Sequence, residues 1–261
     1  MINTYNESDL HLTLKKMYAL EFNGKTEVRL EGADWICDII DENGNAIEIQ
    51  TSNLSALTEK AEFILKSGKK LKIVHPILAE KYIEMLDSSG STLYRKKSPK
   101  KASIYDSLRG MTKICTLFLN EKCTLEVLFV RATEFRRRTA NEVQTMNKSR
   151  RHLKNWVPAG KRLEEILEKK IFSTKKDFTD LLCGAENYVS AKNIGDEAES
   201  KSALFRVCDI ARAIKAKSGT KSGAKDARWA SLLAWILLKM NLIEVKATKG
   251  RSKYYGICDD E

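Results

Sequence analysis

Histidine is scarce in this sequence, and its cysteines are scattered. Only three of the 261 residues are histidines, and none has the spacing from a cysteine that zinc sites show. The six cysteines include no Cys-x-x-Cys pair. These absences argue against a structural zinc site and predict reduced cysteines that pack in the core.

Long apolar runs are also missing. The N-terminal stretch MINTYNESDLHLTLKK lacks an apolar signal region, and no segment is long and apolar enough to span a membrane. We therefore expect a cytoplasmic protein without a membrane partner.

The charge of the chain is strongly basic. Forty-six Lys and Arg stand against 35 Asp and Glu, which gives a formal net charge of +11. The densest stretch is 131–162, with ten basic residues and two acids. A basic excess favours a polyanionic partner, and we expect DNA.

The first half of the chain has the pattern of an α/β domain. Asn43-Gly44 separates two apolar runs, which is typical of a β-hairpin turn. The order of the elements indicates a mixed central sheet flanked by helices. Apolar spacing predicts helices at 10–22, 53–68, 79–87 and 105–121, and strands near 26–31, 34–40, 45–51, 70–77 and 124–132.

The second half is mainly helical. Pro158-Ala159-Gly160 suggests a boundary between domains at 1–158 and 159–261. Helices are expected at 162–172, 204–217 and 226–240, followed by a strand, a turn at Lys249-Gly250 and a strand. This order resembles a winged-helix domain, which implies DNA contacts from the second helix and the hairpin. The candidate contacts are Lys225, Arg228, Lys249 and Arg251.

Two acidic residues lie on neighbouring strands of the predicted hairpin. Asp38 is on one strand, and Glu48 is on the next, two residues before Gln50. Two carboxylates on adjacent strands suit a hard cation such as Mg²⁺ or Mn²⁺, completed by the Ile49 carbonyl and water. Such an ion can activate a water for phosphodiester hydrolysis. The alternative is a pair of ordinary hairpin acids facing solvent.

These residues and their flanking elements resemble the PD-(D/E)XK nuclease superfamily, the core of many restriction enzymes, over roughly residues 9–78. The stretch VRLEGADWICDIIDENGNAIEIQTSNLSAL is similar to a bacterial branch with a C-terminal winged helix. The resemblance places Asp38 and Glu48 at the motif acids and Gln50 at the motif lysine. It implies Glu27 as a further acid, with Glu21 as the alternative.

Several cations could complete such a site. Arg95, Lys96, Lys97 and Lys100 belong to a basic loop, LYRKKSPKK, that could hold a phosphate backbone, as could Arg136 to Arg138. Lys72 or Lys97 could supply the positive charge that Gln50 lacks, because an amide is a neutral hydrogen-bonding group.

Three functional hypotheses follow. The first is a metal-dependent DNA endonuclease with a restriction-endonuclease-like core and a winged helix that selects the site. The second is a nuclease fold that no longer cleaves and acts as a DNA-binding regulator, which Gln50 keeps open. The third is structure-selective RNA binding. Double-strand cleavage needs two active sites, so a homodimer is a further expectation.

Overall fold

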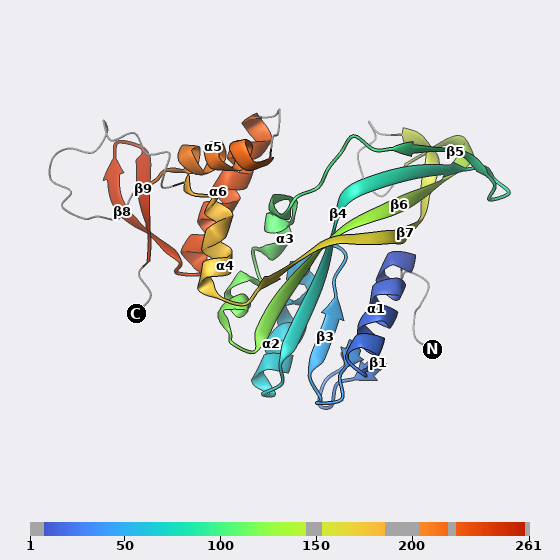
Figure 1. Cartoon of the computed structure of the whole chain (residues 1–261), viewed down its shortest axis with the longest axis horizontal. Coiled ribbons are helices and arrows are strands. Elements are labelled where there is room, and N and C mark those ends of the chain that lie inside the picture. Colours follow the sequence, from blue (N-terminus) through green and yellow to red (C-terminus); the bar gives the residue numbers. More distant parts are fainter. Residues whose placement is uncertain (1–7, 145–152, 186–203, 219–222, 259–261) are drawn as a thin grey trace. The chain divides into compact units, whose positions relative to one another are not determined.

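The structure is a computed structural model that describes residues 8–144, 153–185, 204–218 and 223–258. These residues form a seven-stranded mixed sheet, six α-helices and a separate C-terminal hairpin (Figure 1). The predicted α/β class is therefore confirmed. In this part of the chain no helix is both long and apolar enough to cross a membrane.

The chain divides into two compact units that interleave along the sequence. The first, which we call the sheet unit, comprises Met1–Ser52, Lys66–Ser103 and Glu126–Lys170. The second, the helical unit, comprises Asn53–Leu65, Ile104–Leu125 and Ile171–Glu261. The predicted boundary between residues 158 and 159 falls inside a single long strand.

The sheet has the strand order β1-β2-β3-β4-β6-β7, and β5 pairs with β4. Strands β1, β2 and β3 form an antiparallel meander, and β3 then pairs with β4 in parallel. The bounds are β1 Lys25–Arg29, β2 Ile36–Ile40, β3 Ala46–Ile49, β4 Leu71–Leu86, β5 Thr92–Lys97, β6 Cys123–Gln144 and β7 Leu153–Phe172.

The hairpin between β2 and β3 confirms the prediction from Asn43-Gly44. Gly44 has a φ of 77°, a conformation in which glycine carries little steric cost. The Asp41 carboxylate accepts hydrogen bonds from the main-chain N–H groups of Asn43 and Asn45 at 2.9 and 2.7 Å. The turn therefore fixes the register that brings the two strands together.

Helix α1, Asp9–Glu21, lies along the sheet beside β1 and β3 (Figure 1). The Ser8 side chain caps it by accepting a hydrogen bond from the His11 N–H at 3.3 Å. Leu20 is 82% exposed, although it is apolar. The buried residues are Leu10, Leu14, Lys15 and Tyr18.

The core between α1 and the sheet is aliphatic apart from one tyrosine ring. It consists of Leu10, Leu14, Tyr18, Ile39, Ile47, Ile49, Val74, Leu128, Val130 and Ala132. Burial of aliphatic side chains at about 25 cal/mol per Å² is the main force that holds the helix on the sheet. The polar residues on the same face of α1 therefore also lie against the sheet.

Two predicted helices in the sheet unit are strands. The stretch 79–87 continues β4, with Ile83 and Met85 buried and Glu84 between them less so, which is the period of a strand. The stretch 162–172 belongs to β7. Its Leu, Glu and Lys residues favour a helix in isolation, but pairing with β6 satisfies the main chain and overrides that preference.

The helical unit contains the remaining helices and the C-terminal hairpin. The predicted single helix over 105–121 is instead three short pieces. One reason is that the Ser55 hydroxyl donates to the Gly110 carbonyl at 2.7 Å, which fixes a close approach of two chain segments.

The bounds in this unit are η2 Leu54–Leu57, α2 Thr58–Lys66 (whose last residue belongs to the sheet unit), η3 Ile104–Ser107, α3 Leu108–Met111, η4 Cys115–Leu119, α4 Lys175–Thr179, η5 Asp180–Leu182, α5 Val207–Ser218, α6 Gly223–Lys239, β8 Ile243–Lys249 and β9 Ser252–Ile257.

The C-terminal part has the order of elements predicted for a winged helix. Helices α5 and α6 pack together, and β8 and β9 form an antiparallel hairpin. Phe205, just before α5, forms an isolated bridge with Tyr255 of β9. Helix α6 also packs on the 104–119 segment, where the Lys239 ammonium donates to the Thr112 carbonyl at 2.9 Å.

Candidate functional site

Three acidic residues fall in one row across the meander. Thr26 pairs with Ile39 and Val28 with Cys37, so this register places Glu27 opposite Asp38. Ile39 pairs with Ile47, and one further step in that register places Asp38 opposite Glu48. The predicted acids Glu27, Asp38 and Glu48 are therefore brought together on β1, β2 and β3.

The carboxylates of Asp38 and Glu48 each accept a hydrogen bond from the main chain of the other residue's strand. The Asp38 carboxylate accepts a hydrogen bond from the Ile49 N–H at 2.8 Å. The Glu48 carboxylate accepts one from the Asp38 N–H at 3.3 Å and one from the Cys37 thiol at 3.0 Å. Glu48 is buried, whereas the Asp38 side chain is 18% exposed. The two carboxylates thus have fixed positions, and solvent can reach the edge of the pair.

Helix α1 adds two residues that the sequence interpretation did not place in the site. His11 Nε2 lies 3.4 Å from the Asp38 carboxylate, and the Lys15 ammonium forms an ion pair with Glu27. The Lys15 side chain is 5% exposed. The two residues are four apart and so share one face of the helix. That spacing was visible in the sequence, but its orientation toward the sheet was not.

Glu27 has an unusual backbone conformation. Its φ is 56°, in the left-handed region that non-glycine residues rarely adopt, although it lies within β1. The carboxylate reaches Lys15 from this position. The alternative acid Glu21, at the end of α1, is exposed. The structure therefore groups Glu27 with the other two acids.

A second buried polar cluster lies further along α1. Tyr18 donates a hydrogen bond to Glu126, which is only 4% exposed. Lys72 lies 3.1 Å from the same carboxylate, and Lys169 lies 3.6 Å from it. Burial and the adjacent Glu126 both raise the pKa of the Tyr18 phenol, so it stays a hydrogen-bond donor. Lys72 is thus paired with Glu126, not with the acids of the meander.

Gln50 directly follows β3. Its N–H donates to the Val74 carbonyl at 2.8 Å, and its own carbonyl accepts from His75 Nδ1 at 2.5 Å. Burial lowers the pKa of His75, although the hydrogen bond to Gln50 opposes this, so the ring is neutral at neutral pH. The main chain at Gln50 is therefore fixed on both sides.

The donor set fits a hard divalent cation in its chemistry. Two carboxylates on adjacent strands and the carbonyl of Ile49 are the oxygen donors that Mg²⁺ and Mn²⁺ prefer. Among the described residues no group of three or more His, Cys, Asp or Glu side chains is arranged to hold a metal. An ion at Asp38 and Glu48 would therefore take its other ligands from the main chain, water or substrate.

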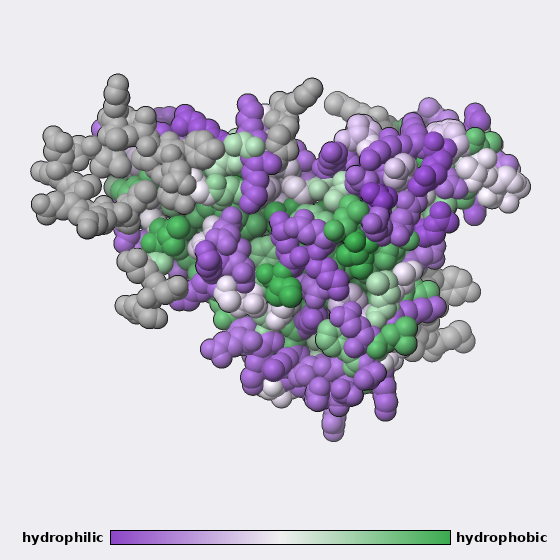
Figure 2. Space-filling model, in the orientation of Figure 1, coloured by the Kyte–Doolittle hydropathy of each residue, from purple (hydrophilic) through white to green (hydrophobic). Residues whose placement is uncertain are grey.

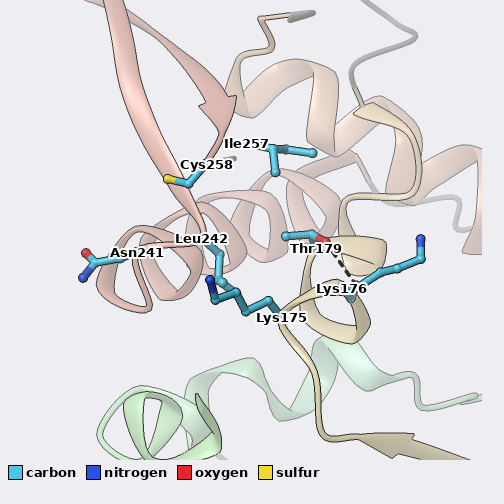
Figure 3. Close-up of a pocket in the computed structure, with 7 residues that line it drawn as sticks. All are labelled: Lys175, Lys176, Thr179, Asn241, Leu242, Ile257 and Cys258. Atoms are coloured by element: carbon cyan, nitrogen blue, oxygen red, sulfur yellow. Dashed lines mark hydrogen bonds between the residues drawn. The ribbon is translucent and has the colours of Figure 1, made fainter. Parts of the chain in front are cut away.

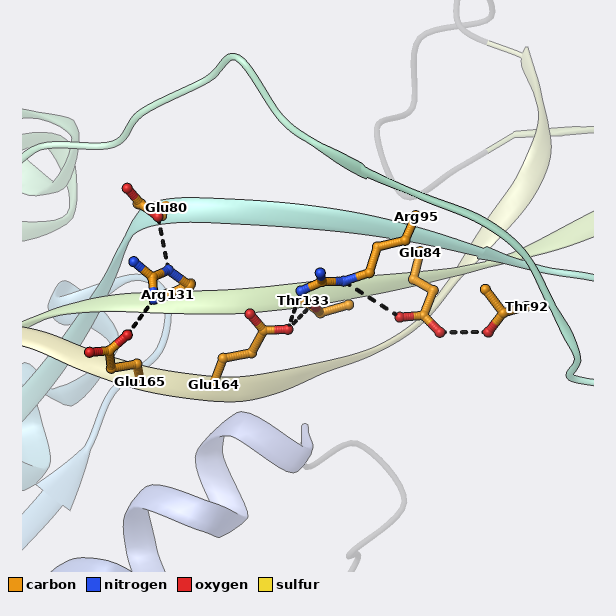
Figure 4. A network of polar contacts seen from close by, with 8 residues as sticks. All are labelled: Glu80, Glu84, Thr92, Arg95, Arg131, Thr133, Glu164 and Glu165. Carbon is orange, nitrogen blue, oxygen red and sulfur yellow. Dashed lines mark hydrogen bonds and ion pairs between the residues drawn. The ribbon is translucent and has the colours of Figure 1, made fainter.

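The predicted basic loop begins as a strand. Arg95, Lys96 and Lys97 lie on β5, and two of them are paired. The Arg95 guanidinium lies 2.6 Å from the Glu164 carboxylate, and Lys97 lies 3.2 Å from Glu80. Glu80 is also the partner of Arg131, which in turn contacts Glu165 (Figure 4). These contacts tie β5, β4, β6 and β7 together.

Hydrogen bonds from cations stabilise the charged form of the acids in these pairs. For Glu164, burial raises the pKa, but hydrogen bonds from Thr133 and Arg95 outweigh it and lower the pKa overall. For Glu134, burial likewise raises the pKa, and the cations Lys81 and Arg136 lower it to below the ordinary 4.5. These acids remain ionised and neutralise their partners at neutral pH.

The candidate DNA-contacting residues of the helical unit differ in their surroundings. Lys225 lies 3.2 Å from the Asp106 carboxylate, with its ammonium 4.1 Å from the centre of the Trp229 ring. It is therefore held against the unit itself. Arg228, on α6, is exposed. Lys249 and Arg251 are exposed at the turn of the β8–β9 hairpin, on either side of Gly250.

A small pocket in the helical unit lies between α4 and the end of the C-terminal hairpin (Figure 3). Lys175 and Lys176 give it a basic edge, and Thr179 donates to the Lys176 carbonyl at 3.1 Å. Its remaining lining residues are Asn241, Leu242, Ile257 and Cys258. None of the predicted site residues lines it.

Comparison with known proteins gives a family but no activity. The chain is 32% identical over 129 residues to an uncharacterized protein of Treponema pallidum (strain Nichols). The match covers 49% of this chain, which spans about half the length of that relative. No solved structure matches the chain. The family model of the domain of unknown function DUF8091 matches residues 8–173, more than half of the chain and most of the sheet unit. The chain therefore belongs to the DUF8091 family.

Proposed function

We propose that this protein is a metal-dependent endonuclease that hydrolyses phosphodiester bonds in DNA. The observations that carry the proposal are two hydrogen bonds across β2 and β3: the Asp38 carboxylate accepts from the Ile49 N–H, and the Glu48 carboxylate accepts from the Asp38 N–H. They hold two oxygen-donor side chains together on two inner strands of the sheet, with Asp38 partly exposed, as a nuclease site of the PD-(D/E)XK type requires. The strongly basic composition supports a nucleic-acid substrate.

Each residue has a defined role in this proposal. Asp38 and Glu48, with the Ile49 carbonyl, would hold Mg²⁺ or Mn²⁺. The bound ion would supply an activated water and stabilise negative charge on the phosphate. Gln50, a neutral hydrogen-bonding group, would orient the water. Glu27 positions Lys15 through their ion pair.

Lys15 is our candidate for the positive charge that Gln50 cannot provide. Lys72 and Lys97 were the earlier candidates, but they lie beside Glu126 and Glu80. Lys15 is buried on α1 and paired with the acid that stands opposite Asp38. A buried ammonium in this position would act in a low dielectric, where its charge has a strong effect. His11, beside Asp38, would hold that carboxylate in place.

The test is cleavage of supercoiled plasmid DNA by the purified full chain with Mg²⁺ or Mn²⁺. We expect nicking that EDTA stops. Asp38→Asn and Glu48→Gln should lower the rate by more than about 100-fold, because loss of a metal ligand exceeds the usual effect of outer contacts. Asp34→Asn is the control, since Asp34 is exposed at the turn between β1 and β2. Circular dichroism should show that all variants are folded.

A second function is favoured by one specific observation. The Gln50 side chain is neutral and cannot supply the positive charge of the motif lysine, which suits a fold that binds DNA without cleaving it. Absence of cleavage of supercoiled, linear and single-stranded DNA with either metal, together with intact DNA binding, would establish this second function in place of the first.

A further inference from the structure

The end of the sheet away from the acid row concentrates most of the net charge. It comprises residues 81–101, 131–144 and 153–162, on β4 to β7 of the sheet unit, and we call it the cationic end. It holds thirteen Lys and Arg against four Asp and Glu, and the adjoining Glu80, Glu164 and Glu165, which pair with three of these cations, reduce the excess from nine to six, where the whole chain has +11. Residues 145–152, the rest of the basic stretch recognised in the sequence, lie outside the described residues.

Some of these cations are neutralised within the sheet. Their partners are acids on the same or other strands of the sheet, and Figure 4 shows two of these pairs, Arg131–Glu80 and Arg95–Glu164. The pairs are Lys81–Glu134 at 2.9 Å, Arg95–Glu164 at 2.6 Å, Lys97–Glu80 at 3.2 Å, Arg131–Glu80 at 2.8 Å and Arg136–Glu134 at 2.6 Å. We assign these cations to the framework of the sheet, not to ligand binding.

The other cations are not neutralised in this way. All eight of them lack an ion pair with the residues that the structure describes, and six of the eight are exposed. They are Lys96, Lys100, Lys101, Arg137, Arg138, Lys154, Lys161 and Arg162. A concentration of uncompensated positive charge on one region attracts a polyanion.

Aromatic and aliphatic side chains lie among these cations. Tyr94 is 44% exposed and Leu93 is 47% exposed on β5, and Leu153 is 50% exposed on β7. The Trp156 ring lies under the Arg136 guanidinium, which is 3.9 Å from its centre. Figure 2 shows hydrophilic residues over the part that carries β5, with more hydrophobic residues among them. A phosphate backbone alone would leave the exposed groups among them, Tyr94, Leu93 and Leu153, without an apolar partner.

We propose that the cationic end of the sheet binds single-stranded nucleic acid. The unpaired cations would contact phosphates, while the exposed Tyr94 and its apolar neighbours would contact the faces of unstacked bases. A duplex hides those faces within its stack, so it would satisfy the charges but not the apolar groups. If the proposed nuclease function holds, on which this part of the inference rests, single-stranded DNA would be a substrate. Binding of single strands can be measured without cleavage.

The experiment is fluorescence anisotropy of a labelled 20-nucleotide oligo(dT) with the full chain in EDTA, across a range of salt concentrations. Arg137→Gln/Arg138→Gln should weaken binding about tenfold. It should also lower the slope of log K against log salt by about 1.4, since each lost single-strand phosphate contact removes about 0.7. Tyr94→Ala should weaken binding without changing the slope, because it removes no charge.

Two control variants match these changes. Lys69→Gln/Lys70→Gln removes two exposed cations elsewhere in the sheet unit, and Leu20→Ala removes an exposed apolar side chain on α1. Both should change binding less than twofold. Equal losses in the control and test variants, equal or tighter binding of a 20-base-pair duplex, or no binding at low salt would each overturn the inference. Cleavage in the plasmid assay is a separate readout, so either proposal can fail alone.

Discussion

At the scale of the residue, α1 changes the chemistry expected from the meander. Sequence patterns pointed to Asp38, Glu48 and Gln50, all of which lie within thirteen residues of one another. The helix adds His11 and Lys15 from more than twenty residues upstream. Both are polar residues on a helix face that also carries Leu10 and Leu14. Because those leucines pack on the sheet, the polar side chains lie close to the acids.

Lys15→Met tests whether that ammonium takes part in the reaction. The variant keeps the length of the side chain and removes its charge. We expect the maximal rate of plasmid nicking to fall by about 100-fold, which is typical for loss of one electrostatic contact in a transition state. The Mg²⁺ concentration for half-maximal activity should stay the same or fall, because a nearby positive charge no longer opposes the cation.

Lys16→Met is the matched control, since Lys16 is the exposed neighbour on the same helix. A purely structural role for Lys15 would reduce the rate only in proportion to the folded fraction, which thermal denaturation measures. Equal nicking rates for the two variants would remove Lys15 from the proposed site.

At the scale of the element, long strands replace two predicted helices. Strands β4, β6 and β7 have 16, 22 and 20 residues, and ion pairs between neighbours run along their length. Local propensity favours helices at 79–87 and 162–172. Whether a segment finds a strand to pair with depends on residues far away in the sequence, so propensity alone cannot predict these strands. The acids Glu80, Glu164 and Glu165, which lie in these two predicted helices, instead neutralise arginines on other strands.

Glu134→Gln tests the stabilising role of these pairs through its pH dependence. Because the pKa of Glu134 in the folded protein lies below its ordinary value of 4.5, the folded state favours the carboxylate. Its contribution to stability is therefore complete above the unfolded pKa and is lost as the pH falls through the folded one. We expect the difference in unfolding free energy between wild type and variant to be largest above about pH 5.5 and to shrink below pH 4.5.

Urea denaturation at pH 7, 5 and 3.5 measures this difference. Glu142→Gln, which changes an exposed acid on the same strand, should show little difference at any of these values. A constant difference for Glu134→Gln across the range would mean that its ion pairs do not stabilise the fold.

At the scale of the whole molecule, two regions carry candidate DNA contacts. The cationic end belongs to the sheet unit, and Arg228, Lys249 and Arg251 belong to the helical unit. We expect Arg228→Ala/Lys249→Ala to weaken binding of a labelled duplex. The slope of log K against log salt should fall by about 1.8 if both residues contact phosphates of B-DNA.

Lys113→Ala/Lys122→Ala removes two exposed cations from the same unit and serves as the control in this binding assay. Duplex affinity that is unchanged by Arg228→Ala/Lys249→Ala would remove the winged-helix-like part from DNA binding and leave the sheet unit as the remaining candidate.

The sequence by itself determined the features that depend on neighbours along the chain. The Asn43-Gly44 turn and the strands on either side of it follow from local patterns, and the structure has them. The placement of Asp38 opposite Glu48 also follows, because a tight hairpin fixes its own register.

The tertiary structure alone decided what lies beside these features. The pairing of Lys15 with Glu27, the continuation of β4 past Pro76 and the strand at 162–172 depend on contacts between distant segments. The same is true of the 104–125 segment, which joins the C-terminal helices in one compact unit. Burial of apolar surface and completion of the sheet set these arrangements, and neither is encoded in a short stretch of sequence.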